Sequence, residues 1–158
     1  MSKRFQEPKG LNDVAEFHDT FNLPVLDSPT IPSKKRCELR INLLQEELNE
    51  LKAAIEDNDL VEVADALCDL QYVLSGAIHE FGIGSKFEDL FSEVHRSNMS
   101  KVCKTLEEAE ETQAHYLKTK NTESFIEEKN GEFLVYRQED KKVLKSIKYS
   151  PADLKSRL

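Results

Sequence analysis

The sequence has few cysteines, no long hydrophobic run and no excess of positive charge. Its three cysteines contain no C-x-x-C pair, which argues against both a disulfide framework and a zinc site. No apolar run approaches the roughly 20 residues of a membrane-spanning helix, and the first residues lack the apolar core of a signal peptide. We therefore expect a cytoplasmic protein with buried, reduced thiols.

The charge balance argues against nucleic acid as a partner. The net charge is −8, from 30 acidic and 22 basic residues, and no basic stripe with interleaved aromatic residues offsets it. An acidic surface repels a nucleic-acid backbone. With 39% apolar and 33% charged residues over 158 positions, the composition suits one ordinary globular domain.

Apolar residues recur at helical spacing through most of the chain. In order, the pattern predicts a short helix over 11–21, an extended proline-containing linker over 22–33, long helices over about 34–56 and 60–81, a fourth helix over about 86–104 and a polar helix over about 106–118. Ser33 is the expected N-cap of the second helix. The fourth helix is expected to bury Phe87, Leu90, Phe91 and Val94.

The composition changes in the last quarter of the chain. Residues 124–147 contain Asn130-Gly131, a pair that predicts a hairpin turn, with Phe133, Val135 and Tyr136 as β-forming residues. A second turn is expected over 138–141. Ser150-Pro151 is typical of the start of a helix, which predicts a last short helix at the C-terminal end.

These elements predict an all-α fold class. We expect a bundle of four or five helices, with the small C-terminal β-hairpin as an appendage. The expected division is a helical domain over residues 1–118 and an extension over 119–158. No internal repeat or low-complexity segment suggests another architecture.

The second and third predicted helices carry acids on a side away from their apolar faces. The six acids are Glu46, Glu47 and Glu50 on the second helix and Glu62, Asp65 and Asp69 on the third. Tyr72 and Gly76 continue the stripe of the third helix. The short break predicts an antiparallel hairpin, which places Glu50 opposite Asp65 and Glu46 opposite Asp69.

This convergence of carboxylates predicts a metal site. Without a counter-charge it is repulsive, and oxygen ligands without His or Cys select a hard cation, Mg²⁺ or Mn²⁺. The alternative is a solvated helix face, and Glu62 has a second reading as part of a capping box that begins at Asp59. Because Lys52 is the only lysine or arginine among residues 41–85, the pattern favours the metal site.

The fourth predicted helix supplies hydrogen-bond donors. Asn98 and Lys101 are one turn apart and within reach of a phosphate oxygen, with Arg96 as a third donor. Basic residues late in a helix more often stabilise the helix dipole. Beside an acidic metal patch, however, they are the donors that a polyphosphate requires.

The paired motif Glu46-Glu47-x-x-Glu50 and Glu62-x-x-Asp65 resembles that of the all-α nucleoside triphosphate pyrophosphohydrolases. This superfamily includes MazG-like proteins, dimeric dUTPases and phosphoribosyl-ATP pyrophosphohydrolase. The segments VADALCDLQYVLSGAIHEFGI and EVHRSNMSK are especially similar to the MazG-like and phosphoribosyl-ATP branch. The likeness covers about residues 11–117 and leaves the hairpin outside.

The resemblance implies a role for each candidate residue. The implied metal ligands are Glu47, Glu50, Glu62 and Asp65, with Glu46 and Asp69 for water activation or a further metal. The implied substrate contacts are Asn98 and Lys101 at the phosphates, with His18 and Phe21 near the base. The gap between Glu50 and Glu62 is at the short end for the family.

The expected function is therefore magnesium-dependent hydrolysis of a nucleoside triphosphate. Water attacks the α-phosphate and releases NMP or dNMP and pyrophosphate, Mn²⁺ being a possible substitute metal. Tyr72 packs against the sugar, Arg96 assists at the pyrophosphate, and the chain forms a homodimer or homotetramer without a nucleic-acid or membrane partner. The alternatives are phosphoribosyl-ATP hydrolysis and a non-catalytic helical nucleotide-binding or interaction module.

Overall fold

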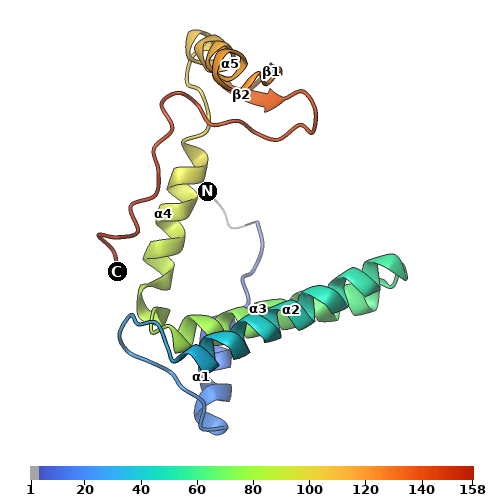
Figure 1. Ribbon diagram of the computed structural model, residues 1–158, viewed down its shortest axis with the longest axis vertical. Helices are drawn as coiled ribbons and strands as arrows, with labels where there is room; N and C mark the ends of the chain where they lie inside the picture. Colours follow the sequence, from blue (N-terminus) through green and yellow to red (C-terminus); the bar gives the residue numbers. More distant parts are fainter. Residues whose placement is uncertain (1–3) are drawn as a thin grey trace. The chain divides into compact units, whose positions relative to one another are not determined.

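A computed structural model describes residues 4–158 of the chain. Its contacts divide the chain into two compact units, the first ending at Phe87 and the second running from Glu88 to Arg157. The described residues form five α-helices and one two-stranded antiparallel sheet (Figure 1). The predicted class, all-α with a small C-terminal β-hairpin, is confirmed.

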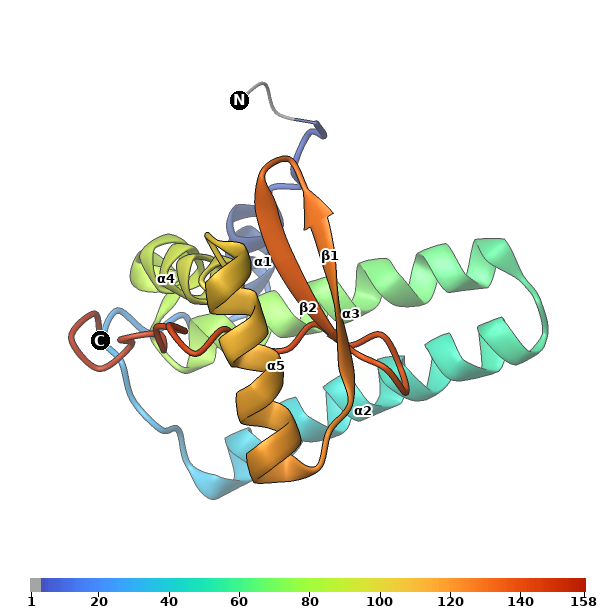
Figure 2. The same ribbon diagram turned by 90° about the horizontal axis from the view of Figure 1, so that it is seen from above.

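The first unit contains α1 (Gly10–Thr20), α2 (Lys34–Glu56) and α3 (Leu60–Glu80). The helices α2 and α3 lie side by side as an antiparallel hairpin (Figure 2), and α1 packs against α3. Asp59 caps α3, because its carboxylate accepts hydrogen bonds from the N–H groups of Val61 at 2.9 Å and Glu62 at 3.2 Å. The predicted hairpin of two long helices is thus confirmed.

The ends of these helices follow the sequence signals with one difference. Ser33 precedes α2 as predicted, but its hydroxyl makes no capping hydrogen bond. Gly82 ends α3 with φ +65°, a conformation that L side chains rarely adopt. A Cβ atom at Gly82 would also lie 1.9 Å from the carbonyl oxygen of Ser28, so the linker requires glycine there.

Much of the apolar surface of the first unit is exposed in the single chain. The buried apolar residues of its helices are few and mostly small: Val14, Ala54, Ala66 and Ile78. Large apolar residues that are more than two-fifths exposed lie on both long helices: Ile41, Leu48, Ile55, Leu60, Leu67 and Leu74. The amphipathic pattern of α2 and α3 therefore has no complete partner within the described chain.

The second unit contains most of α4 (Phe87–Met99), which follows the short 3₁₀ turn η1 (Gly84–Lys86), together with α5 (Leu106–Lys120), β1 (Ser124–Lys129) and β2 (Glu132–Arg137). Asn130 and Gly131 both have positive φ, as the predicted two-residue hairpin turn requires. Its buried apolar cluster is Cys103, Ala109, Val135 and Leu144. The predicted boundary after residue 118 stays a prediction, although α5 here shares a compact unit with the hairpin.

The fourth helix ends earlier than predicted, at Met99 instead of about residue 104. Cys103 instead pairs with Phe133 through two backbone hydrogen bonds of 2.9 Å, so the chain after α4 is extended against β2. The predicted burial also fails in part. Leu90 is buried, whereas Phe91 is 63% and Val94 37% exposed.

The predicted last helix at Ser150-Pro151 does not form, and residues 150–158 contain only a turn. Backbone N–H groups in this segment form hydrogen bonds with side chains of α4 and of the residue that follows α4. The N–H of Ser150 donates to Ser100 Oγ at 2.9 Å, and the N–H of Asp153 donates to a Glu93 carboxylate oxygen at 2.9 Å. In the described part of the chain, no helix is long and apolar enough to cross a membrane.

Candidate active site

The hairpin of α2 and α3 carries the predicted acidic side chains. Three lie on α2 and three on α3: Glu46, Glu47, Glu50, Glu62, Asp65 and Asp69. Spacings of three and four residues keep each set on one side of its helix. The short connection returns α3 alongside α2 (Figure 2). The backbone therefore presents both sets along one hairpin.

Glu47 is the acid of this group whose pKa reflects charges on both helices. Its side chain is half-buried, and its pKa is raised, first by loss of hydration and then by the charges of four other carboxylates. In decreasing order of effect these are Glu50, Asp69, Glu46 and Asp65. Charges from both helices therefore act on one side chain.

Glu62 stands apart from this group. It is exposed in the first turn of α3, and the carboxylates with the largest effect on the pKa of Glu47 do not include it. It does not complete a capping box either, because the backbone N–H of Asp59 donates to the carbonyl of Ala54 at 3.0 Å. Its role as a metal ligand stays a prediction.

The donor set fits a hard divalent cation in its chemistry, although its side chains do not enclose one as placed. Within residues 4–158, no three His, Cys, Asp or Glu side chains are grouped closely enough to hold a metal ion. All the coupled groups offer carboxylate oxygens, the ligands that Mg²⁺ prefers, and Glu46, Glu50 and Asp65 are exposed. A cation among them would relieve the repulsion that raises the pKa of Glu47.

Tyr72 joins the acidic stripe of α3 to an aromatic group on α1. It lies one turn after Asp69, and its ring meets that of Phe17 edge-on at 5.5 Å between centroids. Phe17 in turn contacts Phe21 at 4.5 Å, and all three rings are more than a third exposed. Tyr72 also lines a pocket of about 380 Å³ with residues that include Leu67. Exposed rings beside a pocket can contact a base or a sugar.

His18 is enclosed in the interior of the first unit, with 2% of its surface exposed. Its Nδ1 lies 2.8 Å from the carbonyl oxygen of Pro24, and its Nε2 lies 3.4 Å from Arg40 Nη2. Burial is the main cause that lowers the pKa of His18, so the neutral ring is favoured. A contact between His18 and substrate stays a prediction.

The sequence prediction missed a buried ion cluster next to His18. Glu80, which is 1% exposed, receives hydrogen bonds from Arg36 Nε and Arg40 Nε, both at 2.9 Å. Burial raises the pKa of Glu80, but the two guanidinium groups more than offset this and the net shift is downward. The available signal was the spacing of four between Arg36 and Arg40 on an otherwise amphipathic helix.

Close packing explains why position 76 is a glycine, which the stripe pattern alone did not reveal. A Cβ atom at this position would lie 2.6 Å from Arg40 Nη1 and 3.0 Å from His18 Nε2. Only glycine lets both polar groups approach the backbone of α3. The end of the acidic stripe is thus occupied by a guanidinium and an imidazole held in place by Glu80 and Pro24.

The predicted phosphate donors belong to the second unit. Lys101 Nζ donates to Asn98 Oδ1 at 2.7 Å, so these two side chains form a pair. Arg96 is engaged differently, because it binds both carboxylate oxygens of Glu93, at 2.9 and 2.7 Å, and donates to Ser150 Oγ at 3.0 Å. In this arrangement Arg96 has fewer donors to offer a phosphate than Lys101, and its substrate role stays a prediction.

The matched region of a known family coincides with this site. The model of the phosphoribosyl-ATP pyrophosphohydrolase family matches residues 14–98, more than half of the chain. The chain belongs to this family. All six predicted acids lie within the match, and the phosphoribosyl-ATP pyrophosphohydrolase family consists of hydrolases that act on pyrophosphate bonds. The MazG-like, all-α assignment is therefore confirmed, while Lys101 and the β-hairpin lie beyond the matched residues.

The chain is also similar to a viral protein. Uncharacterized protein L479 of Acanthamoeba polyphaga mimivirus is 24% identical, over 84% of this chain and 89% of that protein. Its name states no activity. The likeness therefore extends across most of both chains but adds nothing about the substrate.

Proposed function

We propose that the chain is a magnesium-dependent nucleoside triphosphate pyrophosphohydrolase. One water molecule is consumed at the α-phosphate, and the products are a nucleoside monophosphate (NMP or dNMP) and pyrophosphate. The observation that carries the proposal is the placement of six acids on the two antiparallel helices of the hairpin, all within the residues that match the family. Family membership supports the type of bond that is hydrolysed.

The proposed metal ligands are Glu47, Glu50, Glu62 and Asp65. Bound Mg²⁺, or Mn²⁺ in its place, would polarise the α-phosphate and neutralise charge on the triphosphate. Glu46 and Asp69 are the proposed bases, each able to accept a proton from the attacking water through a carboxylate oxygen. Both belong to the group that acts on Glu47.

The remaining side chains bind and orient the substrate in this proposal. Asn98 and Lys101 donate to phosphate oxygens of the leaving pyrophosphate. Tyr72 contacts the sugar or base from the exposed aromatic group. His18 acts on the substrate site indirectly in this proposal. Its buried and neutral ring positions Arg40 next to Gly76.

We further propose that the protein works as a homodimer or homotetramer. The support is the exposed apolar surface of α2 and α3, which includes Leu48 at 50% and Leu67 at 52% exposure. Two copies that bury these side chains against each other would gain roughly 25 cal/mol for each Å² of apolar surface removed from water. The cytoplasmic location stays a prediction.

Phosphoribosyl-ATP is a second candidate substrate, favoured by the description of the matching family. It presents the same triphosphate to the carboxylates, so the acidic group does not distinguish it from an ordinary nucleoside triphosphate. A difference in substrate choice must come from contacts to the base and ribose. The two candidates therefore call for a direct comparison.

The experiment is a panel of ribo- and deoxyribonucleoside triphosphates and phosphoribosyl-ATP, assayed for pyrophosphate and for phosphate. We expect stoichiometric release of pyrophosphate and monophosphate that requires Mg²⁺ or Mn²⁺ and stops in EDTA. Preference for phosphoribosyl-ATP over every nucleoside triphosphate would select the second candidate. Release of phosphate alone would contradict attack at the α-phosphate.

Binding without turnover would select the alternative of a helical nucleotide-binding or interaction module. In that case a nucleoside triphosphate raises the thermal midpoint but no pyrophosphate appears. The absence of any thermal shift with Mg²⁺ and nucleotide together would favour an interaction module without a nucleotide site.

A further inference from the structure

The C-terminal segment, residues 145–157, lies along α4 and reaches the residues that were predicted to bind phosphate. The N–H of Ser146 donates to the carbonyl of Lys101 at 3.3 Å, and the N–H of Asp153 donates to Glu93 at 2.9 Å. Successive residues of the segment thus bond to positions of the α4 region in reverse order. All these contacts lie within the second unit.

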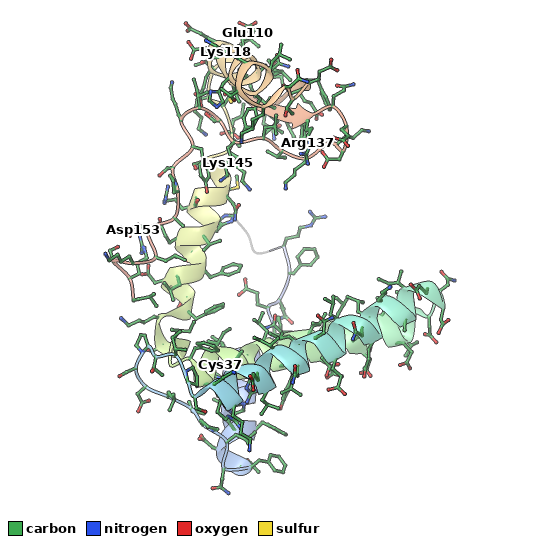
Figure 3. All side chains as sticks on the ribbon, in the orientation of Figure 1. Cys37, Glu110, Lys118, Arg137, Lys145 and Asp153 are labelled. Carbon is green, nitrogen blue, oxygen red and sulfur yellow. The ribbon has the colours of Figure 1, made fainter. Side chains whose placement is uncertain are left out.

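Tyr149 of this segment contacts the residue that precedes Asn98, and Lys145 contacts Tyr149. The Tyr149 hydroxyl lies 2.8 Å from Ser97 Oγ, next to Asn98 in the sequence. Lys145, labelled in Figure 3, has its Nζ 4.3 Å from the centroid of the Tyr149 ring. Tyr149 therefore connects the ammonium of Lys145 to the turn that carries Asn98 and Lys101.

The charges in this cluster are not balanced. Lys101 is paired with a neutral amide and Lys145 with a neutral ring, and the described residues include no carboxylate in an ion pair with either. The neighbouring Lys148 differs, because it pairs with Glu108 at 3.6 Å. Glu108 also accepts from the Ser146 hydroxyl, so that carboxylate is already engaged.

Both ammonium groups affect the pKa of the Tyr149 phenol. Its pKa is lowered, first by the hydrogen bond with Ser97 and then, against the effect of burial, by the positive charges of Lys145 and Lys101. Two lysines from segments more than forty residues apart in the sequence therefore act on one hydroxyl. A pair of unneutralised ammonium groups beside hydroxyl and amide donors is the chemistry that binds phosphate oxygens.

We propose that Lys145 and Tyr149 complete a phosphate-binding cluster with Asn98 and Lys101. The assignment of this cluster to the leaving pyrophosphate rests on the proposed function. The family match ends at Asn98, so Lys145 and Tyr149 would be a substrate-binding contribution of the C-terminal extension. This gives the extension a role in holding the polyphosphate, in addition to packing on α5.

The test is calorimetric binding of inorganic pyrophosphate to the full chain in EDTA at low ionic strength. Lys145→Met removes the charge but keeps an aliphatic stem over the Tyr149 ring. We expect Lys145→Met and Lys101→Met each to weaken binding roughly fivefold or more, and Lys145→Arg to restore it to within about twofold. Lys155→Met, on the same segment but outside the cluster, is the matched control and is expected to bind as the wild type does.

Several outcomes would overturn the proposal. It fails if the wild type binds no pyrophosphate, if Lys145→Met binds it as tightly as the wild type, or if Lys155→Met loses as much affinity as Lys145→Met. Circular dichroism and thermal midpoints identify a variant that has lost its fold. If Lys145→Met has lost its fold, the affinity of Lys145→Arg for pyrophosphate decides whether the proposal holds. Pyrophosphate binding that depends on Lys145 in a protein without hydrolytic activity would refute the proposed function and leave this cluster intact.

Discussion

At the scale of single residues, Glu80 is a buried charge that joins two helices of the first unit. Its carboxylate receives hydrogen bonds from Arg36 and Arg40 while 1% exposed. Removing one member of a buried ion cluster leaves the remaining charges out of water without a partner. The loss of stability is larger than the net stabilisation that the intact cluster provides. The cluster joins α2 to the end of α3, next to Gly76 and His18.

We therefore predict that Glu80→Gln lowers the free energy of unfolding by about 3 kcal/mol. Chemical denaturation at pH 7 measures it. The matched control is Glu38→Gln, an exposed acid of α2 that pairs with Lys34 at 3.6 Å, for which we expect less than about 0.5 kcal/mol. Equal effects of the two substitutions would contradict the account of the cluster.

The pH dependence of this contribution has a definite sign. Because the pKa of Glu80 is lowered in the folded state, the contribution is complete above the pKa of an unfolded glutamate. It is lost as the pH falls through the lowered folded value. The stability difference between wild type and Glu80→Gln is thus expected to shrink in acid.

Residues differ in how far the sequence predicted them. The acids of α2 and α3 were predictable because helical spacing fixes which side they share, and their coupling to Glu47 followed from a three-residue turn. The partners of Glu80 were not, since its two arginines lie 44 and 40 positions away in the sequence. The metal role of Glu62 stays a prediction, because its spacing places it on the same side of α3 but the carboxylates with the largest effect on the pKa of Glu47 do not include it.

At the scale of elements, local signals located most boundaries and failed where distant segments competed. Asp59 and the pair Asn130-Gly131 each placed a cap or turn correctly through their own local preferences. The end of α4 and the last predicted helix were wrong, because pairing of Cys103 with Phe133 and the contacts of the C-terminal segment replaced helical hydrogen bonds. Those pairings depend on tertiary structure and have no local sequence signal.

Glu93 of α4 anchors the C-terminal segment near Asp153, so we predict that Glu93→Ala releases this part of the segment. The Asp153 amide donates to Glu93, and its hydrogen exchange is expected to accelerate roughly fivefold or more when that acceptor is removed. Exchange measured by NMR at neutral pH tests this. Glu110→Ala, an exposed acid of α5, is the control and should leave Asp153 protected.

The hydrogen bond between Glu93 and the Asp153 amide is expected to persist in mild acid. Hydrogen bonds from Arg96 and from the Asp153 amide lower the pKa of Glu93 to about 2. Its contribution is therefore present above the pKa of an unfolded glutamate and is lost as the pH falls through about 2. Loss of Asp153 protection already at pH 5 would contradict this account.

At the scale of the whole molecule, negative charge and exposed apolar surface are both concentrated in the first unit. Residues 1–87 contain 16 acidic and 9 basic side chains, whereas 88–158 contain 14 and 13, which together give the net charge of −8. The large apolar side chains of α2 and α3 are exposed in the same unit. A metal-binding acidic group and a self-association surface are thus proposed on one hairpin.

We predict that Leu67→Glu shifts the protein from an oligomer towards the monomer. Leu67 is 52% exposed on α3, and a charge there cannot be buried against a second copy without a large desolvation cost. Light scattering coupled to size-exclusion chromatography measures the mass. Leu117→Glu, at a residue that is 55% exposed in the second unit, is the control. A wild type that is monomeric at high micromolar concentration would contradict the prediction.

The central claim is that acids from two neighbouring helices hold Mg²⁺ against a triphosphate, and Glu50→Gln tests it most directly. Glutamine keeps the shape of the side chain but removes the negative charge that attracts the cation. The measurement is magnesium-dependent pyrophosphate release from the best substrate of the panel, with Glu56→Gln at the exposed end of α2 as the control. The account predicts a loss on the order of 100-fold or more for Glu50→Gln, with unchanged helicity and an active control. Undiminished turnover by Glu50→Gln would contradict it.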